Sequence, residues 1–174
     1  MTVTRGIRRA SASDAPALAA LAERTFRETF AAANTAADMQ RHCEASYGEA
    51  LQRAEIEDPE RETWVAASDG SLVAFLQLRL PAPCPVNPEA AGAEIQRFYV
   101  DTAFHGRGLA HELMTLAIER AVASGAAVLW LGVWEHNPKA QAFYRKWDFV
   151  VVGEHTFRVG GDPQRDLLMR RTVP

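Results

Sequence analysis

The chain has 174 residues, of which 48% are hydrophobic and 24% are charged, and its formal net charge at pH 7 is -3. This length and composition are typical of a globular domain with a sizeable core, and we expect a single domain over residues 1–174. The slight acidic excess argues against a nucleic-acid-binding protein, which usually shows a basic surface.

Neither the cysteines nor the histidines indicate a metal site. Cys43 and Cys84 lie far apart in the sequence, and the histidines lack the spacing of metal ligands. We therefore expect no metal and reduced thiols, as in a cytoplasmic protein. The N-terminal residues lack the apolar stretch of a signal peptide, and no apolar run approaches the ~18 residues that a membrane span needs. We expect neither nucleic acid nor a membrane as a partner.

The N-terminal part of the chain predicts one strand followed by helices. A short strand is expected at Val3–Arg9, and Ser13 with Asp14 then provides the cap of a helix. A second helical stretch covers roughly residues 35–57, and Gly48 is a point at which it can break into two helices.

Alternation with a period of two then predicts a β-hairpin. The segments TWVAAS and SLVAFLQLRL are rich in β-forming residues and are joined by Asp69-Gly70, a favoured hairpin turn. A loop with four prolines follows between residues 81 and 88, which excludes a central strand there. The loop is either a disordered connector or part of a site, and the sequence leaves both alternatives open.

The second half of the chain alternates strands and helices. In chain order we expect a strand at Glu94–Val100, a helix at Gly106–Ala123, an apolar strand buried on both faces at Ala127–Trp134, a short helix at Asn137–Trp147, and two strands around a turn at Gly160–Pro163. With the first half, this order predicts a mixed α/β domain.

The segment HGRGLA, between a strand and a helix, predicts an anion-binding site. A helix N-terminus carries unpaired amides and partial positive charge, and glycine allows positive φ and close approach. The amides of Gly106, Arg107, Gly108, Leu109 and Ala110 would face a phosphate or diphosphate, with the Arg107 cation beside it. A tight turn without a ligand is the alternative. The segment is neither a P-loop nor a dinucleotide fingerprint.

Two motifs in this order resemble the GNAT superfamily of N-acetyltransferases. HGRGLA is similar to the family's acetyl-CoA motif Arg/Gln-x-x-Gly-x-Gly/Ala, and about 30 residues further NPKAQAFYRK is similar to its Asn-x-x-Ala-x-x-Phe-Tyr-x-Lys segment. The stretches TFRETF, WLGVWEHN and HTFRVGGDPQRDLLM resemble the PaiA-like polyamine acetyltransferases. The resemblance implies an α/β fold with a mixed, mostly antiparallel sheet of about seven strands flanked by about four helices. It also implies an acyltransferase that uses acetyl-CoA.

The resemblance further implies which residues bind acetyl-CoA. The pantetheine arm would run beside the strand end at Phe98–Val100. His105 stands where the family usually has Gln or Arg, and a neutral imidazole would orient the loop by one hydrogen bond. Asp148 stands where the family usually has Gly, which leaves the turn after the last helix open, because Asp can adopt the left-handed region only at a cost that Gly avoids. The implied cofactor-binding set is Phe98, Tyr99, Val100, His105, Gly106, Arg107, Gly108, Leu109, Ala110, Asn137 and Lys146. A plain helix cap for Asn137 and a solvated lysine for Lys146 are the alternatives.

Acetyl transfer requires a base for the amine and an acid for the departing thiol. Tyr144 is the candidate general acid, because it falls on the tyrosine of the second motif and a phenol with a pKa near ~10 is protonated at neutral pH. Glu94 is the candidate base, directly or through water. The resemblance implies this role, because several family members have their base eleven residues before the loop-entry residue, as Glu94 lies before His105. Alternation puts Glu94 on the same side as Phe98 and Val100. An interfacial tyrosine and a solvated acid are the structural alternatives.

The acceptor is less defined than the donor. We expect a primary amine such as a polyamine or another small amine, for which Glu28, beside Phe26 and Phe30, is a candidate lining residue. Transfer to a protein N-terminus or lysine, and a non-catalytic acyl-CoA-binding regulator, are the alternatives. A monomer and a homodimer are both compatible with the sequence.

Overall fold

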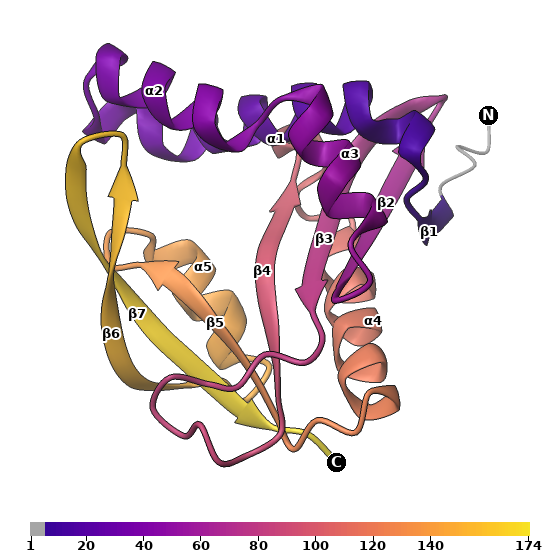
Figure 1. Ribbon diagram of the computed structural model, residues 1–174, viewed down its shortest axis with the longest axis vertical. Helices are drawn as coiled ribbons and strands as arrows, with labels where there is room; N and C mark the ends of the chain where they lie inside the picture. The colour runs from indigo at the N-terminus through magenta and orange to yellow at the C-terminus, as the bar shows by residue number, and fades with distance from the viewer. Residues whose placement is uncertain (1–5) are drawn as a thin grey trace.

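The computed structural model describes residues 6–174 (Figure 1). The first predicted strand is present from Gly6, and its predicted residues 3–5 lie outside the described residues. The main elements are β1 (Gly6–Arg9), α1 (Ala15–Phe30), α2 (Ala36–Ser46), α3 (Glu49–Glu57), β2 (Arg61–Ser68), β3 (Ser71–Arg79), β4 (Gly92–Val100), α4 (Leu109–Ala123), β5 (Val128–Trp134), α5 (Pro138–Arg145), β6 (Val150–Val159) and β7 (Asp162–Thr172).

The strands form one seven-stranded sheet in the order β1-β2-β3-β4-β5-β7-β6. Every neighbouring pair is antiparallel except β4 and β5, which confirms the mixed, mostly antiparallel sheet. Five α-helices, rather than about four, are present within residues 6–174. The difference arises at Gly48, whose extended backbone (φ -141°, ψ 156°) separates α2 from α3.

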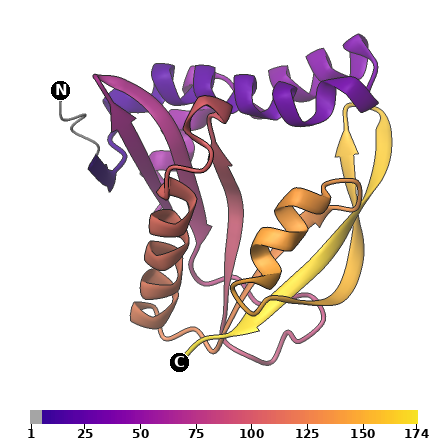
Figure 2. The same cartoon turned by 180° about the vertical axis from the view of Figure 1, so that it is seen from behind.

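Helices cover both faces of the sheet. Figure 1 shows α1 and α2 across one end of the sheet with α3 in front, and Figure 2 shows α4 and α5 together on the opposite face. Leu113 and Phe149 belong to the core on the α4 side, whereas Phe26 and Phe75 belong to the core beneath α1 and α2. Burying each of these large side chains contributes about 1.5–3 kcal/mol, so both faces stabilise the fold.

Local signals in the sequence explain several turns. Asp69 and Gly70 both have positive φ (50° and 80°), as the predicted hairpin turn requires. Asp148 also has a positive φ, 63°, so the aspartate adopts the left-handed conformation at this turn. The proline loop is ordered: the Trp130 indole N–H donates to the Ala82 carbonyl oxygen at 2.8 Å. The loop is therefore anchored on β5 and is not a disordered connector.

The sheet opens in its middle, between the two parallel strands. Gly92–Ile95 of β4 pair with Val128–Leu131 of β5, and beyond these residues the two strands are not paired with each other. β4 remains paired with β3 on its other side up to Val100, and β5 remains paired with β7. We call the opening between residues 96–100 of β4 and residues 132–134 of β5 the wedge. It leaves one edge of β4 with backbone groups that lack a strand partner in the described part of the chain.

Candidate active site

The glycine loop lies at the end of β4 and leads into α4. Gly106 and Gly108 have positive φ values of 73° and 84°, as predicted. Gly108 is the N-cap of α4, and Leu109 is buried beneath it. A Cβ placed on Gly106 would meet no atom within 4 Å, so the space in front of the loop is open. The loop thus has both the backbone conformation and the room that an anion site at this helix N-terminus needs.

His105 joins the glycine loop to α5. Its Nε2 lies 2.8 Å from the Val100 carbonyl oxygen, which can only accept, so Nε2 carries the proton. Its Nδ1 lies 2.8 Å from the Lys139 ammonium, which can only donate. These two contacts are those of a neutral imidazole that joins the end of β4 to α5. Sequence reasoning missed Lys139, because nothing marks this exposed lysine as the partner of a residue 34 positions away.

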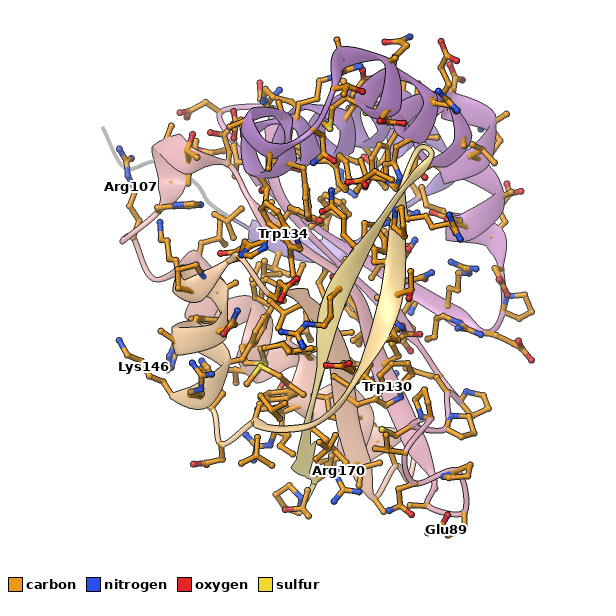
Figure 3. The ribbon with its side chains drawn as sticks, turned by 90° about the vertical axis from the view of Figure 1, so that its left-hand side faces the viewer. Glu89, Arg107, Trp130, Trp134, Lys146 and Arg170 are labelled. Carbon is orange, nitrogen blue, oxygen red and sulfur yellow. The ribbon has the colours of Figure 1, made fainter. Side chains whose placement is uncertain are left out.

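The other predicted residues of α5 occupy its two ends. The Asn137 side chain accepts from the Ala140 amide at 3.1 Å, so Asn137 is the N-cap of α5. Lys146 is exposed at the opposite end of this helix, about 13.5 Å from Asn137 by helical rise. Figure 3 shows Lys146 and Arg107 pointing outward on the same side of the molecule, and the Arg107 guanidinium lies 5.2 Å from the centre of the Phe104 ring. Lys139, rather than Lys146, is the lysine that reaches the glycine loop.

Tyr144 is buried beside the wedge. Its ring packs nearly perpendicular to Phe98 of β4, with ring centres 6.3 Å apart, and also contacts Phe143 and Phe149. Burial, with a smaller contribution from nearby Tyr99, raises the pKa of Tyr144 well above its ordinary value. The phenol is therefore protonated at neutral pH and can donate to a group bound along β4. The structure thus brings Tyr144 and Phe98 together.

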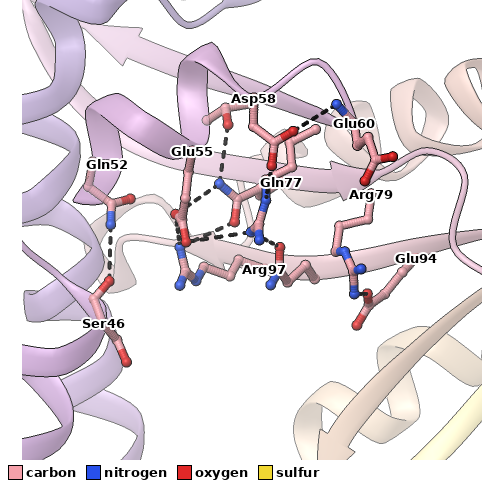
Figure 4. A network of polar contacts seen from close by, with 12 residues as sticks. Ser46, Gln52, Glu55, Asp58, Glu60, Gln77, Arg79, Glu94 and Arg97 are labelled. Atoms are coloured by element: carbon pink, nitrogen blue, oxygen red, sulfur yellow. Dashed lines mark hydrogen bonds and ion pairs between the residues drawn. The ribbon is translucent and has the colours of Figure 1, made fainter. Parts of the chain in front are cut away.

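Glu94 lies on the opposite face of β4 from the one predicted. Strand β4 carries an extra residue, Gln96, relative to β3, and this bulge breaks the alternation. Phe98 and Val100 pack toward the core on the α4 side. Glu94 points to the other face, where its carboxylate accepts from Arg79 at 3.2 Å (Figure 4). The prediction that Glu94 shares a face with Phe98 and Val100 is wrong.

The Glu94 carboxylate is mostly buried, with 15% of its side chain exposed. Burial raises its pKa, and the Arg79 guanidinium partly opposes this. Glu94 is paired with Trp130 in the closed part of the sheet, below the wedge. Four residues of extended strand separate Glu94 from Phe98, or about 13 Å. An amine reacting beside Phe98 would therefore exchange protons with Glu94 only through an intermediate group.

The same face of β4 carries a polar network that the sequence did not indicate. Arg97 forms an ion pair with Glu55 of α3 and a hydrogen bond with Gln77 of β3 (Figure 4). The Arg97 guanidinium also lies over the Tyr47 ring, 5.3 Å from its centre. These partners come from α3, from β3 and from the connection between α2 and α3. The network therefore holds α3 against the sheet beside the wedge.

Aromatic side chains surround the wedge on the α1 and α2 side. The ring of Phe26 stacks on His42 with centres 4.2 Å apart, and Phe30 packs against Trp134 at 4.9 Å. Burial lowers the pKa of His42, which makes the imidazole neutral at pH 7. Glu28 is exposed, and its role in lining an acceptor site stays a prediction.

Comparison with known proteins agrees with this geometry. The sequence profile of the acetyltransferase (GNAT) family matches residues 18–149. The chain therefore belongs to the GNAT family of acetyltransferases. It is 32% identical over 163 residues to an uncharacterized N-acetyltransferase of Lactobacillus delbrueckii subsp. lactis, covering 94% of each chain. It is 31% identical over 161 residues to one of Mycobacterium tuberculosis, covering 92% of this chain and 99% of the relative.

Solved structures show the same fold. The PaiA N-acetyltransferase of Thermoplasma acidophilum, in complex with coenzyme A, matches with a TM-score of 0.79 and 20% identity, over 97% of this chain and 99% of that one. The ribosomal-protein-S18-alanine N-acetyltransferase of Escherichia coli matches with a TM-score of 0.71 and 17% identity, over 98% of this chain and 94% of that one. Within residues 6–174, no helix is long and apolar enough to cross a membrane.

Proposed function

We propose that this acetyltransferase moves an acetyl group from acetyl-CoA directly to the primary amine of a small cationic acceptor such as a polyamine. The observation that carries the proposal is the wedge. Its β4 edge, the glycine loop and Tyr144 lie on the donor side, and carboxylates and aromatic rings lie on the other face. A direct transfer needs a donor and an acceptor to meet at one opening of this kind.

The residues of the donor side fit acetyl-CoA. Residues 96–100 offer backbone groups with which the amide-bearing arm can pair as an added strand. The amides at the start of α4 and the Gly106–Gly108 conformation suit its diphosphate, and the Arg107 cation lies in the same loop. When bound there, the cosubstrate supplies the activated acetyl group. His105 holds the loop to the end of β4, so that the two binding segments keep their spacing.

Tyr144 and Glu94 would handle the protons. The Tyr144 hydroxyl stays protonated and lies against Phe98, so it can donate to the departing sulfur. Glu94 is a mostly buried carboxylate with a raised pKa, as a base for an ammonium group requires. Because Glu94 lies below the wedge, its proton would travel through an intervening group or water.

The acceptor side favours a small amine over a peptide. The tip of the β6–β7 hairpin contacts α2, where the Gly161 amide donates to the Asp38 carboxylate at 2.8 Å. A Cβ on Gly160 would lie 2.6 Å from the Asp38 carbonyl oxygen, so the two segments touch closely. This contact, seen at the upper left of Figure 1, bridges the end of the wedge that an extended peptide would have to cross.

The test is thiol release from acetyl-CoA with spermidine, spermine, putrescine or no added amine. Cys43 and Cys84 are both buried, so their background reaction should be slow. We expect at least one polyamine to accelerate release and to appear as its N-acetyl product. If no polyamine accelerates release but a peptide with a free N-terminus does, the acceptor assigned here is wrong. If acetyl-CoA binds and no amine of either kind reacts, the chain is a non-catalytic acyl-CoA-binding protein.

A further inference from the structure

A second buried acid lies on the acceptor side of the wedge. Asp166 of β7 is paired with Trp134 of β5 and with His155 of β6. Its Oδ2 lies 3.6 Å from the Nε2 of His155. Its Oδ1 is also buried and has no hydrogen-bond partner among residues 6–174. Since buried carboxylate oxygens are normally hydrogen-bonded, this one lacks a partner that a bound ligand could supply.

Gly132 makes room for this carboxylate and imidazole. A Cβ at Gly132 would lie 2.8 Å from His155 Nε2 and 3.1 Å from Asp166 Oδ2, closer than real Cβ atoms can approach the imidazole. Only glycine therefore lets both groups lie over β5. Although β5 is a central strand, Gly132 is exposed, so this part of the face is open to solvent.

Asp166 lies beside the wedge, next to the residues where the proposed reaction takes place. Glu94 lies in the part of the sheet where β4 and β5 are still paired. The last pair between β4 and β5 is Ile95 with Leu131. Trp134, which is paired with Asp166, stands three residues beyond this pair on β5, as Phe98 does on β4. Phe98 is also the residue against which Tyr144 packs.

Tyr99 connects the two sides of the wedge. Burial raises its pKa to about 12; nearby Arg97 opposes this and the Asp166 carboxylate adds to it. Tyr99 in turn contributes to the raised pKa of Tyr144. Asp166 and Tyr144 thus both interact electrostatically with Tyr99 of β4.

We propose that Asp166, oriented by His155, binds the ammonium nitrogen of the acceptor in the wedge and accepts its proton. This inference rests on the proposed function and deepens it by assigning the acceptor site, with Asp166 in place of Glu94 as the base that contacts the amine. Asp166 is a catalytic residue in this scheme because it touches the reacting nitrogen, and His155 is a positioning residue. With 42% of its side chain exposed, against 11% for Asp166, His155 also connects the buried carboxylate to solvent.

The proton balance of the step is closed. The Asp166 carboxylate takes one proton from the ammonium group and passes it to water by way of His155. The free amine then forms the nitrogen–carbon bond to the acetyl group as the carbon–sulfur bond breaks. Tyr144 gives its proton to the sulfur, and the second nitrogen proton leaves through Asp166 and, through solvent, restores the phenol. One proton is released for each amide formed.

The surroundings of Asp166 suit a base that acts near neutral pH. Burial raises its pKa to about 6, and the neighbouring His155 partly opposes this. From β4, Tyr99 and Glu94 face the same region, and Glu94 interacts with His155 as well. His155 thus lies within electrostatic range of both carboxylates, and its close contact is with Asp166. A base with a pKa slightly below the working pH is ionised yet still accepts protons effectively.

The experiment measures kcat/KM for spermidine between pH 5 and 9, with acetyl-CoA affinity from calorimetry. Variants are Asp166→Asn, Gly132→Ala and Glu94→Gln. Glu154→Gln is the matched control, because this exposed acid of β6 is adjacent to His155 in the chain. We expect Asp166→Asn to lower kcat/KM by about 100-fold or more, to abolish the rise in activity through pH 6, and to leave acetyl-CoA affinity within about twofold.

Gly132→Ala keeps both groups but displaces them, so we expect it to lower kcat/KM with unchanged acetyl-CoA affinity. The proposal is overturned if Asp166→Asn retains wild-type kcat/KM, or if its activity still rises through pH 6 and only Glu94→Gln removes that rise. In both cases wild-type turnover leaves the proposed function standing. If the wild-type enzyme acetylates no amine at all, the proposed function and this inference are both wrong.

Discussion

Asp166→Asn should stabilise the protein while removing its activity. Burial and the partial opposition of His155 leave Asp166 with a pKa of about 6, against an ordinary value of 3.8. At about 1.36 kcal/mol for each pH unit between the two values, the ionised carboxylate costs about 3 kcal/mol at neutral pH. Asparagine has the same shape without the charge, so its substitution should return much of this free energy of unfolding.

The gain in the free energy of unfolding of Asp166→Asn should increase with pH. The folded chain holds the Asp166 proton more tightly than the unfolded chain, so ionisation opposes folding. Below about pH 3.8 the carboxyl is protonated in both states and the cost is absent. The destabilisation by the ionised Asp166 carboxylate grows between pH 3.8 and about pH 6 and reaches its full value above pH 6. At neutral pH we expect a rise in Tm of about 6–12 °C for a domain of this size.

Thermal unfolding of the wild type, Asp166→Asn and Glu154→Gln at pH 7.5 and pH 4 tests this reasoning. The exposed Glu154 variant should unfold close to the wild type at both values. We expect Asp166→Asn to have a higher melting temperature than the wild type at pH 7.5, and we expect this difference to be smaller at pH 4. A melting temperature at or below that of the wild type at pH 7.5, or an equal gain at both pH values, would refute the argument.

Three further variants probe the donor side. Tyr144→Phe should lower kcat about 100-fold with acetyl-CoA affinity unchanged, measured by steady-state kinetics and calorimetry; unchanged turnover would exclude this hydroxyl as the acid. Gly108→Ala forces a side chain to φ 84° and should weaken acetyl-CoA binding about tenfold by calorimetry; wild-type affinity would contradict an ordered loop. Lys139→Met removes the contact to His105 and should weaken acetyl-CoA binding by a smaller factor, and tighter binding would instead identify Lys139 as a block at the loop.

The fold was predictable because its signals are local. The hairpin at Asp69-Gly70 and the glycine loop depend on backbone conformations that the residue types themselves favour, and all four positive φ values at Asp69, Gly70, Gly106 and Gly108 agree. The face of Glu94 was not predictable. Alternation along β4 fails at Gln96, and that bulge depends on how β4 pairs with β3. Register is a property of two strands, and one strand's sequence does not contain it.

The acceptor side of the site was hidden for the same reason. His155 and Asp166 both lie in HTFRVGGDPQRDLLM, yet the motif gives no sign that Gly132, on a third strand, leaves space for them. The contact of Lys139 with His105 likewise joins a loop to a helix that follows a separate strand. The sequence therefore indicated the proposed donor side, which one loop and one strand end define, and gave no sign of the proposed acceptor side, which three neighbouring strands build.

Burial acts on both sides of the wedge with opposite chemical results. It raises the pKa of Tyr144, which is already protonated at neutral pH, and so makes the phenol a more secure proton donor. It also raises the pKa of Asp166, but only to about 6, so the carboxylate stays ionised at pH 7 and becomes a better base. One desolvated opening can thus keep an acid protonated beside the sulfur and a base ionised beside the nitrogen. The cost is the unpartnered Asp166 oxygen, and an incoming ammonium group would supply the missing partner.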